Sequence, residues 1–309
     1  MKVAICAIAK NENLYIREWV EWYKNLGVSK IFLYDNNDPD GERFEEVIDD
    51  YIKSGFVEII DVRDAPLSYI EVDQNNKAYR CSIQHKCYLE CYKTKVSDFD
   101  WIGFFDIDEF VTFRNEYTLE SFLNQEIFED TDTVLIPWVE YDDNNLIHYD
   151  DRPVMERFTH LTSRHGWNLV KSFARTNKEI YDDSMRNMIH CFKLQGDRIK
   201  YANGRRIPFI NNMSNWYMAN DLVVNTSNCI LNHYKTKTIE EFLRRRVNRV
   251  WTQDDFFSRP VLEKIDDAIK EFYMYCVRTD EKEEYIKQYR IKNEGNIDVD
   301  VYGRCNVQI

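Results

Sequence analysis

Short apolar runs alternate with longer amphipathic segments through the first third of the chain. From Ile16 to Leu26, hydrophobic residues recur at intervals of three and four, which predicts a helix that Gly27 ends. The same reasoning predicts strands over 3–9, 30–35, 56–62 and 101–105 and helices over 16–26, 42–53 and 76–96. Strands that alternate with helices in this way predict an α/β fold with a mainly parallel central sheet and helices on both faces.

The pattern becomes irregular after residue 134 and then turns helical beyond Thr238. It predicts strands over 133–139 and 228–234, helices over 239–251 and 261–278, and a tail over the last residues. We therefore predict one α/β domain over residues 1–237 and a helical C-terminal extension over 238–309.

The balance of charge limits the partners that the chain can take. The formal net charge is −13, and the basic residues do not gather into an aromatic-lined groove. A negative surface repels a phosphate backbone, so we expect no nucleic-acid partner. An acidic protein can still hold a phosphorylated ligand when a metal ion bridges the two.

The cysteines and the N-terminus bear on the compartment. Eight cysteines show neither a CxxC pair nor a dense framework, which indicates free thiols in a reducing compartment. Lys10 and Asn11 end the first apolar run, which fits a strand better than a secretory signal peptide. No stretch approaches the roughly 18 to 20 apolar residues that span a bilayer. We therefore expect a cytoplasmic protein.

The stretch "WIGFFDIDEF", residues 101–110, runs from an apolar strand into three carboxylates. In an extended chain Asp106 and Asp108 would project to the same side while Ile107 turned into the core. Two converging carboxylates suit Mg²⁺ or Mn²⁺, and open α/β sheets bind ligands at the carboxyl ends of their strands. The alternative is an acidic loop whose carboxylates are simply solvated. The nine glycines are isolated and form no phosphate-binding loop, so nucleotide binding would depend on a metal and on loop side chains.

Four segments of the chain occur in a telling order, namely "AICAIAKNENLYIREWVEWYKNLGVSKIFLYDNNDPDG", "WIGFFDIDEFV", "KSF" at 171–173 and "LNHYKTKTIEEFLRR" at 231–245. In this order they resemble glycosyltransferase family 92 and the related family 2-like enzymes of GT-A fold. The resemblance implies a GT-A-like domain that transfers a sugar from a nucleotide donor, typically a UDP-sugar with Mn²⁺ or Mg²⁺, to a glycan hydroxyl. It also implies inversion at the anomeric carbon.

The resemblance assigns roles to individual residues. It implies nucleotide-sugar contacts from Lys10, Asn11, Glu12, Asp35, Asp106, Lys171 and Lys237, and metal ligation by Asp106, Asp108 and His233. Each has a plainer alternative. Asp35 could cap the turn before Pro39, His233 could be a satisfied structural histidine, and Lys171 could extend over core surface beside Phe173.

The acceptor side is less defined. A carboxylate that deprotonates the attacking hydroxyl is expected after the fifth strand, where Glu140, Asp142 and Asp143 are candidates that spacing does not separate. Many family members read W-x-x-F-G-S-G here, whereas this chain departs from that pattern after Trp138. Four aromatic residues could stack on sugars or belong to the core, namely Trp138, Tyr141, Trp167 and Trp216.

The acceptor class follows from the compartment and the resemblance together. We expect a glycan or lipid-linked glycan acceptor in polysaccharide or glycoconjugate biosynthesis. Four arginines would lie on one C-terminal helix, which could contact the anionic inner face of the membrane or simply be solvated. They are Arg244, Arg245, Arg246 and Arg249.

Two other functions fit parts of the pattern. Four apolar residues followed by DxD also occur in haloacid-dehalogenase-like phosphatases, where the first aspartate is the nucleophile and the second an acid or base. Glu109 and Phe110, in place of the small polar residue usual after that pair, argue against this class. The third reading is a non-catalytic carbohydrate-binding protein that keeps the fold without turnover.

Overall fold

The chain forms two compact units. The computed structural model describes residues 1–66, 68–72, 76, 78–162, 168–180, 189–195, 198–207, 218–247 and 260–293. The first unit comprises residues 1–139 and 166–233, and the second comprises residues 140–165 and 234–309. Within the described ranges, no helix is both long and apolar enough to cross a bilayer.

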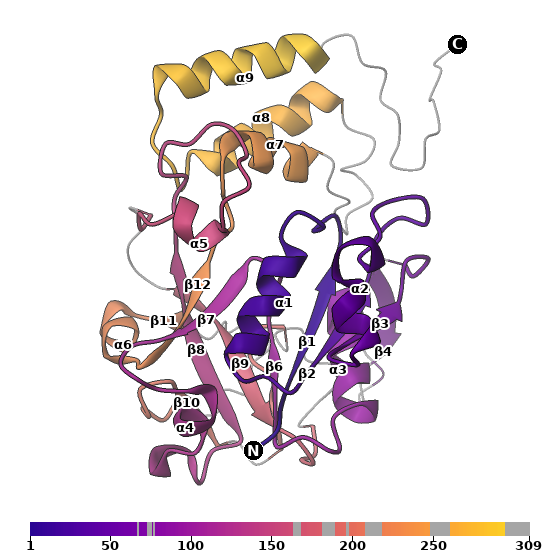
Figure 1. Ribbon diagram of the computed structural model, residues 1–309, viewed down its shortest axis with the longest axis vertical. Coiled ribbons are helices and arrows are strands. Elements are labelled where there is room, and N and C mark those ends of the chain that lie inside the picture. Colours follow the sequence, from indigo (N-terminus) through magenta and orange to yellow (C-terminus); the bar gives the residue numbers. More distant parts are fainter. Residues whose placement is uncertain are drawn as a thin grey trace. The chain divides into compact units, whose positions relative to one another are not determined.

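A mixed sheet forms the centre of the first unit (Figure 1). Its order is β3-β2-β1-β6-β9-β8-β12-β7, with β10 beside β8 and β11 beside β9. The strands are β1 (Val3–Ala9), β2 (Lys30–Asp35), β3 (Val57–Asp61), β6 (Trp101–Phe104), β7 (Glu109–Phe113), β8 (Thr133–Glu140), β9 (Asn168–Arg175), β10 (Ile199–Tyr201), β11 (Met218–Ala219) and β12 (Cys229–His233). β3, β2, β1 and β6 are parallel, whereas β9 runs antiparallel between β6 and β8. The predicted α/β class and the predicted strands are confirmed.

Helices cover this sheet as the apolar spacing predicts. α1 (Ile16–Asn25) buries Trp19, Val20 and Tyr23, and Gly27 follows it with a φ of +92°, a left-handed conformation that favours glycine. α2 (Glu45–Lys53) packs beside α1, as Figure 1 shows. α3 (Ile83–Thr94) packs Tyr88 and two cysteines against alternate residues of β1, β2 and β6. The remaining helices described in this unit are α4 (Leu119–Leu123), the 3₁₀ turn η1 (Glu126–Phe128) and α6 (Asp221–Thr226).

The predicted helix over 76–96 is only partly correct. A hairpin of β4 (Ser68–Val72) and β5 (Ala78–Ser82) precedes α3 and forms a separate two-stranded sheet. The Ser82 side chain then accepts a hydrogen bond of 3.2 Å from His85 N, which caps α3 at its first turn. The helix therefore begins at Ile83.

Gly103 lets β6 and β9 approach each other closely. It stands opposite Phe173 in the register of the two strands. A Cβ atom at this position would lie 2.4 Å from Phe105 Cε2 and 2.8 Å from Phe173 Cε1. Any larger residue would force these rings apart beside the acidic motif, so the absence of a side chain here is a packing requirement.

The second unit is helical in the part that the structure describes. Its helices are α5 (Val154–Arg157), α7 (Ile239–Val247), α8 (Val261–Phe272) and α9 (Asp280–Asn293). Ile239, Phe242 and Leu243 of α7 pack against Ile265, Ile269 and Phe272 of α8 in one core. The two predicted C-terminal helices are confirmed over these ranges, whereas α9 was not predicted.

The predicted basic helix face is wrong for one of its arginines. Arg246 is 4% exposed and pairs with Glu271, which also pairs with Lys235 at 3.0 Å. Arg244 is exposed and Arg245 is half-buried, while Arg249 lies outside the described residues. A buried, paired guanidinium cannot meet a membrane, so the face holds fewer cations than the sequence suggested.

Candidate functional site

The topology brings three loops of the first unit to one edge of the sheet. β2, β1 and β6 are parallel neighbours, so their carboxyl ends meet there. β1 ends at Ala9 before Lys10, β2 ends at Asp35, and β6 ends at Phe104 just before Asp106. The predicted loops thus converge, and the antiparallel strands β9 and β12 add residues that lie far away in the sequence.

Asp106 and Asp108 lie in a turn, so the prediction of an extended chain at this point is wrong. β6 ends at Phe104 and the next strand, β7, begins at Glu109. Asp106 N donates to Glu109 Oε2 at 2.9 Å, and Glu109 N donates back to Asp106 O at 3.1 Å. Ile107 is 3% exposed and does point into the core. Glu109 therefore closes the turn that presents both aspartates.

Helix α1 anchors the strand that follows the turn. Trp19 Nε1 and Tyr23 OH both donate to Glu109 O at 3.0 Å, and Val111 N donates to Tyr23 OH at 3.2 Å. These polar groups are buried, and leaving them without partners would cost roughly 1–3 kcal/mol each. The aromatic residues of α1 therefore hold the start of β7 in place as well as filling the core.

Asp106 is held by three side chains from two other elements. Lys171 Nζ on β9 lies 3.0 Å from Asp106 Oδ2 and 3.6 Å from Glu109 Oε2. On α3, Gln84 Nε2 donates to Asp106 Oδ1 at 2.7 Å and Tyr88 OH donates to the same oxygen at 3.4 Å. The Asp106 side chain is still 36% exposed, so it can also meet a ligand.

Burial and charge act on the ionisable groups of this cluster in opposite directions. Burial opposes the charge on Lys171, but Asp106 and Glu109 beside it raise the pKa of the ammonium above its usual value. Burial raises the pKa of Glu109 well above its usual value, while Lys171 works against that shift. Lys171 therefore remains a buried cation among carboxylates.

Asp108 and His233 form the second pair of the site. His233 stands opposite Glu109 in the antiparallel β12–β7 pair, which places its Nε2 3.7 Å from Asp108 Oδ1. Both residues are 5% exposed. Trp138, from β8, packs its ring on the His233 imidazole with centroids 4.3 Å apart. The predicted partners Asp108 and His233 thus do come together.

These two residues fit a hard divalent cation as a two-residue donor set. A carboxylate and an imidazole in contact suit Mn²⁺ or Mg²⁺, which keep positions for phosphate oxygens and water. Across the described ranges, no group of three or more histidine, cysteine or acidic side chains is arranged to hold a metal. Asp106 is engaged by Lys171 and Gln84, so the structure favours it less than Asp108 as a direct ligand.

The residues after β1 organise the loop through their backbones. Lys10 Nζ pairs with Asp38 Oδ1 at 2.6 Å. Asn11 has a φ of +58°, and its N–H donates to Asn37 Oδ1 at 2.7 Å. Glu12 O accepts from Tyr15 N and Ile16 N at 2.9 Å, which begins α1. The loops after β1 and β2 are thus tied together.

Asp35 caps a turn and also keeps one oxygen that makes no hydrogen bond. Asn37 N donates to Asp35 Oδ1 at 2.9 Å, as the alternative reading of this residue expected. Asp35 Oδ2 and Asn37 Nδ2 are buried and make no hydrogen bond within the described part of the chain. Arg63 Nε lies 3.6 Å from Asp35 Oδ2, and burial is the main cause of the raised pKa of Asp35. A buried acceptor and a buried donor therefore stand near each other in this loop.

The other predicted residues lie in the second unit. Asp143 is buried and pairs with Lys282 Nζ at 2.5 Å, and Asp142 Oδ1 accepts from Asn144 N at 2.8 Å. Glu140 is half-buried, and Lys237 is 3% exposed with a φ of +54°. Their roles stay predictions.

The predicted sugar-stacking aromatics have mixed placements. Tyr141 stacks on Tyr234, with ring centroids 4.9 Å apart. Trp138 is 8% exposed and already packs on His233, so little of its ring is open to a sugar. Trp167 and Trp216 lie outside the described residues.

Sequence reasoning missed several residues of this cluster. Glu109 was noted as a charge but not as a site residue, although its position three residues after Asp106 allows it to close the turn. Gln84 and Tyr88 are one helical turn apart, a spacing that places them on one face of α3. His190 gave no local signal because it lies within the irregular region. Its ring packs edge-on against Trp138, with centroids 5.5 Å apart.

We expect His190 to make the protein less stable in mild acid. Burial, followed by the charge of Lys171, lowers the pKa of His190 to about 4, so the folded protein keeps it neutral. Its Nδ1 lies 3.2 Å from Val170 O, to which the neutral ring donates. The unfolded chain protonates histidine near pH 6.5, so stability should fall as pH drops from about 6.5 to 4, by up to about 3 kcal/mol.

Urea unfolding at pH 7 and pH 5 tests this, with His190→Asn as the comparison because asparagine keeps a donor for Val170 O. The wild type should lose more stability than the variant between the two pH values. Equal losses in both proteins would contradict the role of His190.

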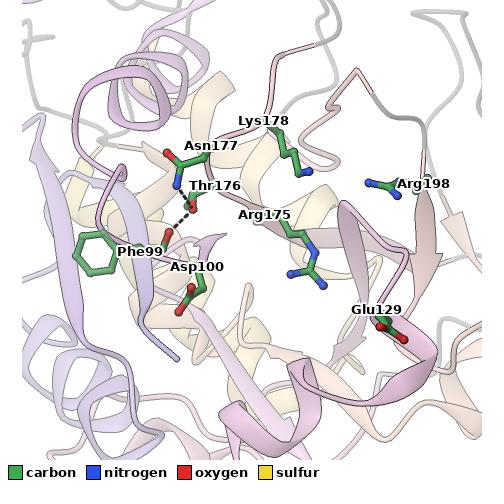
Figure 2. Close-up of a pocket in the computed structure, with 8 residues that line it drawn as sticks. All are labelled: Phe99, Asp100, Glu129, Arg175, Thr176, Asn177, Lys178 and Arg198. Carbon is green, nitrogen blue, oxygen red and sulfur yellow. Dashed lines mark hydrogen bonds between the residues drawn. The ribbon is translucent and has the colours of Figure 1, made fainter.

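A cavity of about 460 Å³ lies at the opposite edge of the sheet (Figure 2). It is lined by residues just before β6, by the end of β9 and the residues after it, by Glu129 after η1, and by Arg198 just before β10; its cations are Arg175, Lys178 and Arg198. Arg198 makes two hydrogen bonds to Asp132, and Arg175 donates to Thr131 O at 2.7 Å and Phe128 O at 3.0 Å. The two arginines thus fasten neighbouring loops, and the cavity is separate from the acidic edge.

The chain resembles known proteins over most of its length. The sequence model of glycosyltransferase family 92 matches residues 1–293. A family 92 protein of Ricinus communis is 24% identical over 267 residues, which cover 81% of this chain and 38% of that protein. One of Oryza sativa subsp. japonica is 28% identical over 121 residues, covering 39% and 18%. The chain therefore spans less than half the length of these curated relatives.

Among solved structures, residues 1–349 of S. aureus TarS in complex with UDP-GlcNAc are similar at 11% identity and a TM-score of 0.38. The match covers 70% of this chain and 62% of that one. The family match begins at residue 1, before β1, takes in the acidic turn and His233, and ends with α9 at residue 293. Since it takes in nearly all of the sequence, the chain belongs to glycosyltransferase family 92.

Proposed function

We propose that this chain is a metal-dependent glycosyltransferase that moves a sugar from a UDP-linked donor to a hydroxyl of a glycan, with inversion. The observation that carries the proposal is the acidic turn, where Asp108 and His233 lie together beside an Asp106 held by Lys171. Family 92 membership supplies the reaction class. The acceptor, including a lipid-linked one, is part of the same proposal.

The loop after β2 supports uracil as the base. Asp35 Oδ2 can accept a hydrogen bond and Asn37 Nδ2 can donate one, and both buried atoms make no hydrogen bond within the described chain, although Arg63 Nε lies 3.6 Å from Asp35 Oδ2. Uracil presents N3–H beside a carbonyl oxygen, which complements this pair. Adenine and cytosine present a ring nitrogen acceptor beside an amino group, which would leave both protein atoms unsatisfied. Guanine offers the same pattern as uracil, so it is the base to test against it.

Asp108 and His233 would hold the metal ion. When bound there, Mn²⁺ or Mg²⁺ supplies Lewis-acid stabilisation of the negative charge that grows on the departing diphosphate. Asp106 is partly exposed and pairs with Lys171, which suits an acceptor of hydrogen bonds from ribose hydroxyls. The sugar gains oxocarbenium character as its bond to phosphate breaks, as in glycosidases.

The proposal places the general base among Glu140 and Asp142 in preference to Asp143. A base must have a lone pair free to receive the acceptor proton. The Asp143 carboxylate is buried against the Lys282 ammonium, which is 0% exposed, and Asp143 Oδ1 accepts from Asn145 N. Asp142 and Glu140 are only half-buried. Substituting Glu140 and Asp142 one at a time, and measuring sugar transfer, would show which of them is the base.

The structure gives less support to a phosphatase. There Asp106 would be the nucleophile, which needs an available carboxylate oxygen. Lys171 occupies one oxygen of Asp106, while Gln84 and Tyr88 occupy the other. A non-catalytic carbohydrate-binding protein would have no need of this charged arrangement.

Calorimetric titration with UDP, GDP, ADP and CDP, each with Mn²⁺ and with EDTA, tests the proposal. We expect UDP to bind with Mn²⁺ and to bind at least about tenfold, or ~1.4 kcal/mol, more weakly in EDTA. Titrations with UDP-glucose, UDP-galactose and UDP-N-acetylglucosamine then identify the sugar. Binding of GDP alone would overturn the uracil assignment. Absence of any nucleotide binding, together with hydrolysis of p-nitrophenyl phosphate, would favour the phosphatase instead.

A further inference from the structure

We propose that Lys171 and Glu109 are positioning residues, which form an ionic lock that holds the acidic turn in its binding shape before the donor arrives. This inference rests on the proposed function, because it concerns how Asp106 is made ready for that donor. The resemblance to the family instead suggested that Lys171 contacts the nucleotide-sugar directly.

The register of the sheet fixes where Lys171 lies. In the β6–β9 pair, Phe104 is the last residue of β6 and stands opposite Ser172. Lys171 therefore extends one residue past the end of β6, level with the turn. On its other side it pairs with Ile136 of β8. Because strands flank β9 on both sides, the backbone at Lys171 has little freedom to move.

The side chain of Lys171 is enclosed and its charge is fully engaged. It is 2% exposed, and its Nζ lies 3.0 Å from Asp106 Oδ2 and 3.6 Å from Glu109 Oε2. The Tyr88 ring approaches it from α3, with its centroid 6.0 Å from Nζ. An ammonium buried among partners in this way cannot reach a diphosphate without breaking its existing pairs. Its geometry suits holding Asp106 better than binding the donor.

Glu109 completes the lock from the other end of the turn. Its side chain is 0% exposed, yet its Oε2 accepts from Asp106 N at 2.9 Å. Glu109 thus contacts the backbone of Asp106 while Lys171 contacts the side chain. The two carboxylates would repel each other without the cation between them. One lysine therefore fixes both the conformation of the turn and the direction of the Asp106 carboxylate.

A double-mutant cycle on the full chain separates positioning from direct contact. Lys171→Met removes the cation and leaves two carboxylates facing each other, so we expect UDP with Mn²⁺ to bind about 10- to 100-fold more weakly. Glu109→Gln keeps an oxygen to accept from Asp106 N and removes one negative charge. In the Lys171→Met/Glu109→Gln double variant the repulsion is gone, and we expect most of the lost UDP affinity to return.

Arg175→Met is the matched control. Arg175 is a half-buried cation at the opposite end of the same strand, bonded to backbone carbonyls of other loops. It should lower the melting temperature and leave the UDP affinity of the folded protein unchanged. This comparison distinguishes an effect on the acidic turn from a general loss of stability in β9.

Three results would overturn the inference. The double variant could bind UDP as weakly as Lys171→Met, which would make Lys171 a direct donor contact. Lys171→Met could melt lower yet bind UDP like the wild type, which would make the lock merely structural. The decreases in melting temperature caused by the two single substitutions could also simply add up in the double variant. That result would show that Lys171 and Glu109 are not coupled. The melting temperatures can be compared even if the wild type does not bind UDP. A failure of this inference can therefore be told apart from a failure of the proposed function.

Discussion

Replacing Asp108 with asparagine is expected to lower kcat/KM for sugar transfer on the order of 1,000-fold, while the protein stays folded. Asparagine preserves the shape of this 5%-exposed side chain and removes only its charge. A metal ion in such a site supplies several kcal/mol of stabilisation to the departing diphosphate, and each 1.36 kcal/mol corresponds to about tenfold in rate. His233, 3.7 Å away, would remain as a single protein donor.

The matched comparison is Asp106→Asn, two residues earlier in the same turn. Asparagine can still accept from Gln84 and can still meet a ribose hydroxyl, so we expect mainly a higher KM for the donor and a smaller loss of kcat. Initial rates at varied Mn²⁺ and donor concentrations, with circular dichroism melts of each variant, provide the measurement. Full Mn²⁺-dependent activity in Asp108→Asn would show that Asp108 does not ligate the metal.

Six strands of the main sheet were predictable because each carries a run of mostly apolar residues that needs no distant information, whereas β7, β9, β10 and β11 were not predicted. Val3–Ala9 and Thr133–Glu140 are recognisable in this way, and both are confirmed. β4 and β5 escaped because their side chains are mostly exposed or half-buried and form a hairpin outside the main sheet. α9 escaped because only Lys282 and Ile286 of its residues are buried, so its sequence carries no apolar stripe.

The candidate site was predictable in its residue types and less so in its geometry. The alternation that puts residues i and i+2 on one side applies to extended chains, whereas Glu109 folds 106–108 into a turn. The partners of that turn come from pairings far apart in the sequence, with Lys171 placed by β6–β9 and His233 by β7–β12. Only the family resemblance indicated these two residues, since nothing local in the chain reports strand order.

The second large effect is expected at Asp143, where substitution should cost stability before it affects chemistry. Lys282 Nζ is buried, lies 2.5 Å from Asp143 Oδ2, and also donates to Asn145 Oδ1 and Val277 O. Asp143→Asn would leave this ammonium buried without its counter-charge. Breaking a buried pair from one side costs about 3–5 kcal/mol, so we expect a loss of about 3 kcal/mol in the free energy of unfolding.

The double variant Asp143→Asn/Lys282→Met decides whether Asp143 also acts as the general base. Removing both charges should restore most of the stability, because no unpaired ion remains buried. Urea unfolding measures the stability, and sugar transfer is then assayed on the restored protein. If transfer returns with stability, Asp143 serves only to hold Lys282, and Glu140 and Asp142 remain as the candidates. If the stable double variant stays inactive, the base is Asp143, and the ion pair with Lys282 must open for the acceptor to be deprotonated.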